Sequence, residues 1–418
     1  MKDMLKILAM LLAIPACNHL APFPDDEEKS AGEQLAPWQE GCIDIHQIST
    51  GRGDCALLIL PDGTTLVVDA GDLGSGTYVQ EIMMRVPSQA RTPGEWQVRY
   101  MKHFLTEAGL DPNHIDYLLA THFHSDHIGT PSAYSIPSAN GKYQMSGISY
   151  VCNYMDVDTL LDRDWPDYSH PVADIYKGGC WTNYREFVRD RESRGGGMAR
   201  FEPGRKDQIV LKNKPSAYPD FEIRNIYCNG WLWTGNGTDT EYIIPEDETI
   251  GNLTNENLLS AVLKLSYGKF DYHTGGDILG ASAGTWRDIE SKVCPRVGEV
   301  DAMNCDHHSY RDAMNSTIIK SSMAQVYVIP VWDYYHPEPA PLARMLDESL
   351  YDGERMVFAA GLVGSNRARL GEDGEKIKPD GHVVIRVYPG GDKFQVFVLN
   401  DRTSDFEVIY KTDIINSR

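Results

Sequence analysis

The densest group of potential metal ligands lies between Thr121 and Thr130, which read THFHSDHIGT. His122 and His124 are two positions apart, so on an extended segment both imidazoles point to one side and can bind one cation. Asp126 and His127 follow where the chain is expected to turn into a helix, and they can reach a second cation. Imidazole and carboxylate ligands suit Zn²⁺, with Mn or Fe as alternatives. A surface loop rich in histidine by chance is the plain alternative, which three histidines and one aspartate within six residues do not favour.

Other polar and aromatic residues could take part in chemistry, but each also has a structural interpretation. His170 could be a third ligand of the first cation, although a surface histidine in an irregular segment is favoured. His273 is expected to pack inside a strand. Asp69 is expected to orient the metal loop, with a turn aspartate as the alternative. Trp231 and Trp233 could line a cleft, but packing in the core is favoured.

The composition is that of an ordinary globular protein, with 418 residues of which 42% are hydrophobic and 24% charged. The length allows two or three domains or one enlarged α/β domain. The formal net charge of -21 repels long polyanions, so a nucleic-acid-binding surface along the whole chain is not expected. The arginine-rich stretch 185–207 could attract a phosphate, but a solvated helix followed by a glycine-rich loop explains it equally well.

The N-terminus predicts export. Residues 1–16 combine two lysines with a short apolar run, and Ile14-Pro15-Ala16-Cys17 has the form of a bacterial lipobox. We expect a lipid anchor on Cys17, an acidic tether over 17–40 and a periplasmic or cell-surface protein; an ordinary signal peptide cleaved nearby is the alternative. Among the remaining seven cysteines Cys152 and Cys180 are the first candidates for a disulfide, with buried thiols an equal alternative.

The hydrophobic pattern predicts two β-rich halves, each with helices. Such halves are typical of two sheets packed between helical layers. A helix is expected to begin at Thr92-Pro93 and end at Gly109, and a buried strand to lead into Thr121. Residues 132–218 are expected to form an irregular insert with a strand over 148–152 and a helix over 184–194. The other expected strands are 43–48, 56–60, 65–68, 115–120, 221–227, 258–267, 269–274, 325–331, 382–388 and 394–399, and a helix is expected over 339–350.

The loop His122-Phe-His124-Ser-Asp126-His127 matches the HxHxDH signature of the metallo-β-lactamase superfamily, and the chain resembles this superfamily beyond the loop. The resemblance implies an α/β fold of the αββα type, a four-layer sandwich, in one domain over 41–412. It covers roughly residues 41–400 and is strongest to the ComEC-type competence hydrolase branch. The segments that carry it are GRGD at 51–54, LVVDAG at 66–71, the run from Asn257 through SAVLKL at 260–265 to Asp277, DHHS at 306–309 and YHP at 335–337.

The same resemblance implies a ligand set for two divalent metal ions. Metal 1 would be bound by His122, His124 and His308, and metal 2 by Asp126, His127 and His336, with Asp277 bridging both. Which histidine of the pair His307–His308 is the ligand stays open. Asp126 and His307 are the residues with implied catalytic roles, and Tyr335 is a second candidate for a hydrogen bond to the attacked centre. Ser309 and Tyr335 both stand where the branch has glycine.

The implied activity is that of an exported binuclear hydrolase. Phosphodiesters are the favoured substrates, because the branch includes nuclease-like and phosphorylcholine-esterase-like members and two metals suit displacement at phosphorus. The negative charge favours a small or envelope-derived ester over long nucleic acid, although a nuclease is not ruled out. Hydrolysis of a lactam, lactone or thioester on the same metals, and a non-catalytic metal-binding surface lipoprotein, are the alternatives.

Overall fold

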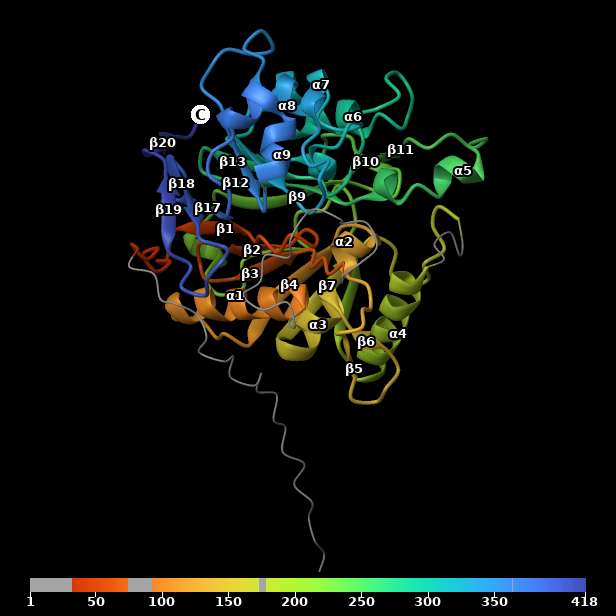
Figure 1. The fold of residues 1–418 in the computed structure, drawn as a ribbon. Helices are drawn as coiled ribbons and strands as arrows, with labels where there is room; N and C mark the ends of the chain where they lie inside the picture. Colours follow the sequence, from red (N-terminus) through yellow and green to blue (C-terminus); the bar gives the residue numbers. More distant parts are fainter. Residues whose placement is uncertain (1–31, 74–91, 173–177, 363) are drawn as a thin grey trace, which may run out of the picture.

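The computed structural model describes residues 32–73, 92–172, 178–362 and 364–418. The expected signal peptide, Cys17 and the first part of the tether lie outside the described residues. Two β-sheets pack face to face, and helices cover the outer face of each (Figure 1). In the described part of the chain, each helix is too short or too polar to cross a lipid bilayer.

The first sheet combines antiparallel strands with a parallel run. Its order is β19-β18-β17-β1-β2-β3-β4-β7-β8, with β20 paired to β18. Pairing is antiparallel from β19 to β3 and parallel from β3 to β8. The strands are β1 (Ile43–Gln47), β2 (Ala56–Ile59), β3 (Thr65–Val68), β4 (His114–Ala120), β7 (Asp156–Asp162), β8 (Gly197–Arg200), β17 (His382–Val387), β18 (Lys393–Leu399), β19 (Val408–Lys411) and β20 (Ile415–Asn416).

Three helices connect the parallel strands of the first sheet and cover its outer face: α1 (Pro93–Glu107), α3 (Gly147–Tyr154) and α4 (Gly179–Ser193). Parallel neighbours need such crossovers because a tight turn cannot join them. The start of α1 is the expected one. Thr92 accepts a hydrogen bond from the Glu95 backbone N–H at 3.2 Å, and Pro93 occupies the first turn, where its missing N–H costs nothing.

The second sheet repeats this arrangement, with order β11-β10-β9-β12-β13-β14-β15-β16. Pairing is antiparallel up to β13 and parallel from β13 to β16. Its strands are β9 (Phe221–Cys228), β10 (Trp231–Trp233), β11 (Thr240–Tyr242), β12 (Val262–Tyr267), β13 (Phe270–Thr274), β14 (Ala302–Asn304), β15 (Val326–Pro330) and β16 (Met356–Ala360). The crossovers are α6 (Ile289–Val297), α7 (Ser316–Ser322) and α8 (Pro339–Leu346).

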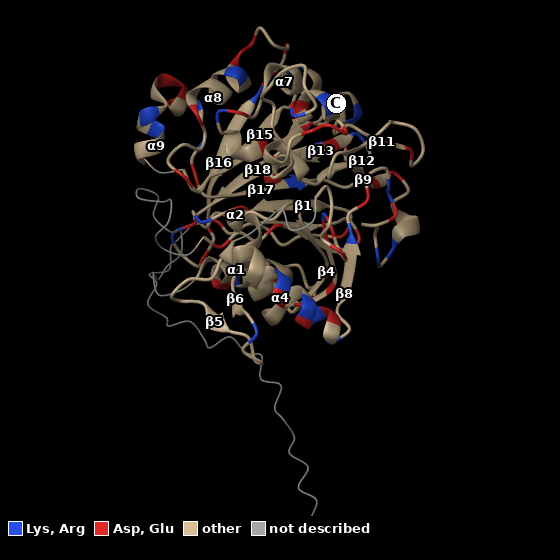
Figure 2. Ribbon diagram, turned by 90° about the vertical axis from the view of Figure 1, so that its right-hand side faces the viewer, with Lys and Arg blue, Asp and Glu red and all other residues tan. Residues whose placement is uncertain are grey.

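Shorter elements complete the described chain. They are α2 (Ser125–Ile128), β5 (Ile136–Pro137), β6 (Gln144–Met145), α5 (Ile250–Leu253) and α9 (Gly364–Arg369), with 3₁₀ turns η1 (Pro215–Ala217), η2 (Glu256–Leu259), η3 (Asp306–Ser309) and η4 (Gly371–Lys376). Figure 2 shows the layers from the side, with charged residues mainly on helices and loops and the strands between them largely uncharged.

Alternating side chains of the strands fill separate cores. In β4, Leu118 packs under the outer helices with Trp96 of α1, whereas Leu119 faces the second sheet and packs with residues such as Leu263. This follows from the two-residue period of a strand. A third core lies between the second sheet and its helices and includes Ile289. The αββα sandwich expected from the resemblance is therefore confirmed.

Most expected strands exist with small shifts at their ends. The strand expected over 258–267 begins only at Val262, because Glu256–Leu259 form the 3₁₀ turn η2. Residues 148–152 are part of helix α3, so the strand expected there is wrong. A short apolar run fits either a strand or a buried helix turn. Here the Ser146 backbone N–H donates to Ser149 Oγ at 3.0 Å, which begins a helix. The range 132–218 is only partly irregular, because it supplies β7, β8, α3 and α4. Cys152 and Cys180 are thiols in the structure and form no disulfide.

Candidate metal centre

The potential ligands from the two halves meet at one edge of the sandwich. His122, His124, Asp126 and His127 follow β4, in a loop that continues into the single turn α2. From the second half, Asp277 follows β13, the pair His307–His308 follows β14, and His336 follows β15. All these loops leave the carboxyl ends of parallel strands, where α/β folds place their binding sites.

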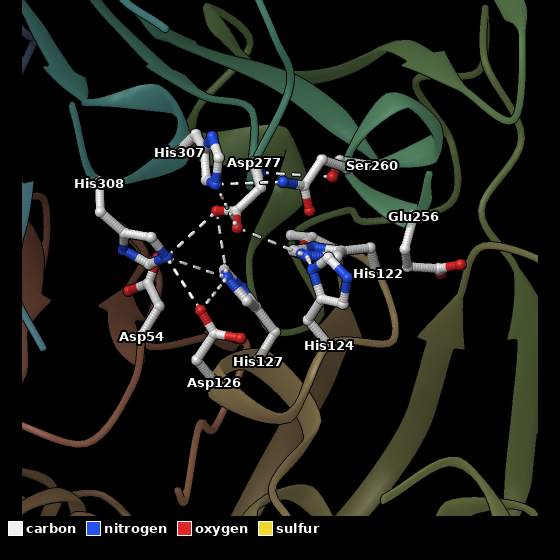
Figure 3. A network of polar contacts seen from close by, with 12 residues as sticks. Asp54, His122, His124, Asp126, His127, Glu256, Ser260, Asp277, His307 and His308 are labelled. Atoms are coloured by element: carbon white, nitrogen blue, oxygen red, sulfur yellow. Dashed lines mark hydrogen bonds and ion pairs between the residues drawn. The ribbon is translucent and has the colours of Figure 1, made fainter. Parts of the chain in front are cut away.

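The first group of ligand atoms consists of Asp126, His127, Asp277 and His308, and all four side chains are buried (Figure 3). His308 Nε2 lies 3.2 Å from Asp126 Oδ2 and 3.3 Å from Asp277 Oδ1. His127 Nε2 lies 3.1 Å from the same Asp277 oxygen. Two carboxylates and two imidazoles thus converge on one point.

The second group consists of His122, His124 and Asp277. His122 Nε2 lies 3.0 Å from His124 Nδ1 and 3.6 Å from Asp277 Oδ2. Asp277 therefore turns one oxygen to each group and stands between them (Figure 3). This is the position that a carboxylate bridging two cations takes.

The hydrogen bonds behind the first group decide which imidazole nitrogen faces the ligands. His308 Nδ1 donates to the backbone carbonyl of Pro330 at 2.9 Å, and His127 Nδ1 donates to Asp69 at 2.7 Å. Each Nε2 therefore faces Asp277, whose buried Oδ1 accepts no hydrogen bond. A nitrogen lone pair cannot face a carboxylate in a buried site without a proton or a cation between them. These residues thus fit a divalent metal ion, and their nitrogen and oxygen donors suit zinc.

The electrostatics of the first group favour positive charge. Burial by itself would lower the pKa of His308, but Asp277 and Asp126 raise that pKa to about 10. The carboxylates of Asp277, Asp69 and Asp126 likewise hold the pKa of His127 well above its ordinary value against the effect of burial. Burial would raise the pKa of Asp277, and the neighbouring imidazoles lower it well below the usual range. A bound cation fills the same electrostatic role as these protons.

Asp69, which directly follows β3 and has a positive φ of 58°, orients imidazoles of both groups. It accepts hydrogen bonds from the Thr121 backbone N–H and hydroxyl, each at 2.7 Å, besides the one from His127. Because the Thr121 hydroxyl donates to Asp69, its oxygen can accept from His122 Nδ1 at 3.1 Å. Asp69 thus directs the Nε2 atoms of His122 and His127 toward Asp277, as the sequence indicated for an orienting carboxylate.

Of the histidine pair left open by the sequence, His308 joins the group of Asp126 and His127. The partition implied by the resemblance, with His308 beside His122 and His124, is not the one in the structure. The backbone explains the difference, because His307 and His308 both have left-handed conformations, with φ of 43° and 52°, and their rings lie nearest different oxygens of Asp277. Ser309 continues this turn with φ of 56°, a conformation that glycine adopts without strain.

His307 lies nearer the other carboxylate oxygen of Asp277. Its Nδ1 donates to Asp312 Oδ1 at 2.7 Å. Its Nε2 lies 3.1 Å from Asn257 Nδ2 and 3.9 Å from Asp277 Oδ2, the oxygen that faces His122. His307 therefore stands beside the second group with its tautomer held by Asp312.

His336 is buried and lies behind His308, outside both groups. The two rings stack with centroids 4.7 Å apart and planes 18° apart. Burial lowers the pKa of His336 well below its ordinary value. Tyr335 is 47% exposed, so its side chain lies largely at the surface.

One segment of the chain matches a protein-family model. Residues 50–130 match the model of the metallo-beta-lactamase superfamily, so this segment is similar to a domain of that superfamily. The matched segment contains the ligands after β4, whereas Asp277, His307, His308 and His336 lie beyond it. None of the curated proteins compared with the chain matches it.

Two solved structures are similar to the chain at low identity. The metallo-beta-lactamase fold protein YhfI from Bacillus subtilis is 13% identical with a TM-score of 0.34, over 75% of this chain and 96% of that one. The short form of human tRNase Z is 12% identical with a TM-score of 0.29, and the match covers 68% of this chain and 91% of that one. Both TM-scores are low, so neither likeness indicates a substrate.

Other candidates from the sequence lie outside the two ligand groups. His170 donates from Nε2 to the Asn229 carbonyl at 3.2 Å and lines a separate cavity of about 350 Å³, together with Trp231. His273 is fully buried on β13 and contacts Asp306 at 3.0 Å, as expected for a packed histidine. Trp233 is half-buried and packs against the outer core of the second sheet.

Sequence reasoning missed three residues around the ligands: Glu256, Asp312 and Trp332. Glu256 is buried, accepts a hydrogen bond from the Phe123 backbone N–H at 3.0 Å and pairs with Arg163 at 2.8 Å. Asn257 was noted only as part of a motif, and Asp312 and Trp332 not at all. Except for that of Asp312, which bonds His307 five residues away, their contacts join separate segments of the chain, so no local spacing indicates them.

Proposed function

We propose that this protein is a binuclear metal-dependent hydrolase that cleaves phosphodiester bonds. The observation that carries the proposal is the placement of Asp277, whose Oδ1 faces His127 and His308 while its Oδ2 faces His122. A buried carboxylate between two sets of imidazoles has the geometry of a shared ligand. The superfamily domain supports metal-dependent hydrolysis as the general class.

Asp126, His127, His308 and Asp277 would hold one cation, and His122, His124 and Asp277 the other, as two zinc ions or as Mn or Fe. Two such cations, when bound, lower the pKa of a water molecule and stabilise the charge that develops on the attacked group. His336 would support His308 by stacking rather than as a ligand, which departs from the role implied by the resemblance.

The side chains around the ligands position the reacting groups. Asp126 places its carboxylate at the point where the first group converges. His307 donates from Nδ1 to Asp312, which leaves Nε2 as an acceptor beside the second group. The Asn257 amide Nδ2 donates to this Nε2 at 3.1 Å and so fixes the direction of the ring.

Phosphodiesters are proposed because the chain resembles the ComEC-type branch of hydrolases, which includes nuclease-like and phosphorylcholine-esterase-like members. The net charge of -21 disfavours long nucleic acid and favours a small or envelope-derived phosphoester.

The activity can be tested directly with the purified, metal-loaded chain. We expect turnover of bis-p-nitrophenyl phosphate, with nitrocefin, a lactone and a thioester as comparison substrates and elemental analysis of the same preparation. Asp277→Asn serves as the matched inactive variant. If the protein hydrolyses the lactam, lactone or thioester but not the phosphodiester, it belongs to the alternative class of lactam, lactone or thioester hydrolases. Two equivalents of metal without any hydrolysis would indicate a binding protein.

The location of the protein is a separate proposal. The lipobox before Cys17 and the acidic tether support an exported lipoprotein anchored in the membrane, and neither lies within the described residues. In cells, Cys17→Ser is expected to move the protein from the membrane fraction to the soluble exported fraction. A variant that still sediments with membranes would place the anchor elsewhere.

A further inference from the structure

We propose that Trp332 is a further catalytic residue, which donates its indole N–H to a non-bridging oxygen of the phosphoryl group being cleaved. The inference rests on the proposed function, because it adds a donor to that reaction site. Trp332 follows β15 and lies four residues before His336. Neither its position nor its neighbours in the sequence indicate a role in chemistry.

The indole of Trp332 points at the convergence point of the first ligand group. Its Nε1 lies 3.1 Å from His308 Nε2. The same His308 nitrogen lies 3.2 Å from Asp126 Oδ2, 3.3 Å from Asp277 Oδ1 and 3.3 Å from His127 Nε2. Carboxylate oxygens only accept, and the imidazole nitrogens there can serve as ligands. An indole N–H only donates, so Trp332 supplies a fixed donor to this group.

The surroundings of Trp332 hold the ring in this direction. It is half-buried and packs with its plane nearly perpendicular to two imidazoles, 84° to both His308 and His336, with centroids 5.8 Å and 4.9 Å away. The preceding residue, Val331, donates its backbone N–H to Ala360 at 2.9 Å and so ties the loop to β16. A donor held by packing needs no reorganisation when charge develops on a nearby oxygen.

The role of His308 explains why this N–H must serve another acceptor. His308 Nδ1 is committed to the Pro330 carbonyl, so Nε2 is the only nitrogen that can bind a cation. A cation and the indole N–H cannot share that lone pair. In the metal-loaded protein His308 Nε2 would be a ligand, so the indole N–H of Trp332 would need another acceptor, and an oxygen of a substrate held at the same point would provide it. The negative charge on such an oxygen makes the new hydrogen bond a charge-assisted one.

The test compares Trp332→Phe with Trp38→Phe in the full metal-loaded chain. Trp38 is a matched control because it is also half-buried and its indole donates to a carbonyl, Cys42 O, at 2.8 Å. For Trp332→Phe we expect unchanged metal content and a kcat for bis-p-nitrophenyl phosphate that is about 10- to 100-fold lower, with little change in KM. Inorganic phosphate, titrated by calorimetry, should bind the variant about 10-fold more weakly. The control should change neither quantity.

A second replacement separates the hydrogen bond from packing. Replacing Trp332 by 3-benzothienylalanine keeps the ring shape and substitutes sulfur for the N–H, and it should reproduce the losses of the phenylalanine variant. Phosphate affinity and kcat within twofold of wild type in both variants would overturn the proposal. So would a loss of one metal equivalent, because Trp332 would then only hold His308 in place. If wild type cleaves no phosphodiester, the proposed function fails, and phosphate affinity still decides whether Trp332 is an anion donor.

Discussion

The two halves of the fold share one topology but supply their ligands in different ways. In each half, antiparallel strands lead into parallel strands joined by helices, and the first parallel strand is β3 in one half and β13 in the other. In the first half, four ligand-type residues follow β4 within the stretch 122–127. In the second half, Asp277 and His308 come from two separate loops, after β13 and β14, and the loop after β15 places His336 against His308. One half thus carries its ligand-type residues in a single loop, whereas the other carries them in separate loops that only the fold brings together.

The turns after β3 and β13 show the same difference on a smaller scale. Both contain glycine and aspartate, in Asp69-Ala70-Gly71-Asp72 and Gly275-Gly276-Asp277. Asp69 stands behind the imidazoles and orients them, whereas Asp277 faces both ligand groups directly. Similar turns at equivalent places therefore serve different roles.

The largest effect is expected where both halves depend on one residue. In Asp277→Asn, a neutral amide replaces the carboxylate between the two groups and cannot offset the charge of two cations. We expect metal content to fall from about two equivalents to below one, and hydrolysis to fall by more than about 100-fold. Elemental analysis and steady-state kinetics measure this. If the variant keeps two equivalents of metal, Asp277 is not a ligand shared by the two cations.

The contribution of the second half to metal binding is tested by His308→Ala, with His170→Ala as the control. Because His308 faces Asp126 and His127, we expect loss of about one equivalent of metal and a fall in rate of about 100-fold. His336→Ala should have a smaller effect, since its ring stacks on His308 outside both groups. His170→Ala should stay within twofold of wild type. If His170→Ala loses activity and His308→Ala stays active, then His170 and not His308 is the metal ligand.

The smallest effect is expected from Thr121→Val, which keeps the shape of the side chain and removes the hydroxyl between Asp69 and His122. The imidazole of His122 then loses the hydrogen bond that directs its Nε2, and one metal should bind about 10-fold more weakly. Competition with a chelator measures this affinity. Thr65→Val is the matched control, because the Thr65 hydroxyl bonds Asp116 near the start of β4, the opposite end of that strand from the ligands. Equal affinities in the two variants would contradict the orienting role of Asp69.

The sequence by itself determined the local features of this protein. The ligands after β4 and the Thr92-Pro93 start of α1 were recognisable because neighbouring residues carry the whole signal. The alternation of β4, with Leu118 and Leu119 facing different cores, likewise predicted a strand buried on both faces. The family model matches the same region, residues 50–130.

Only the tertiary structure decided how the second half completes the site. Which side of Asp277 each histidine faces depends on the left-handed backbone at His307 and His308 and on the Pro330 carbonyl, and no spacing in the sequence encodes these. The direction of the Trp332 indole depends on the packing of loops from different strands. Ligands within one loop are held together by the chain itself, whereas ligands from separate loops meet only when the sheets pack and bury them. For this reason the first half could be predicted residue by residue, and the second half only as a list of candidates.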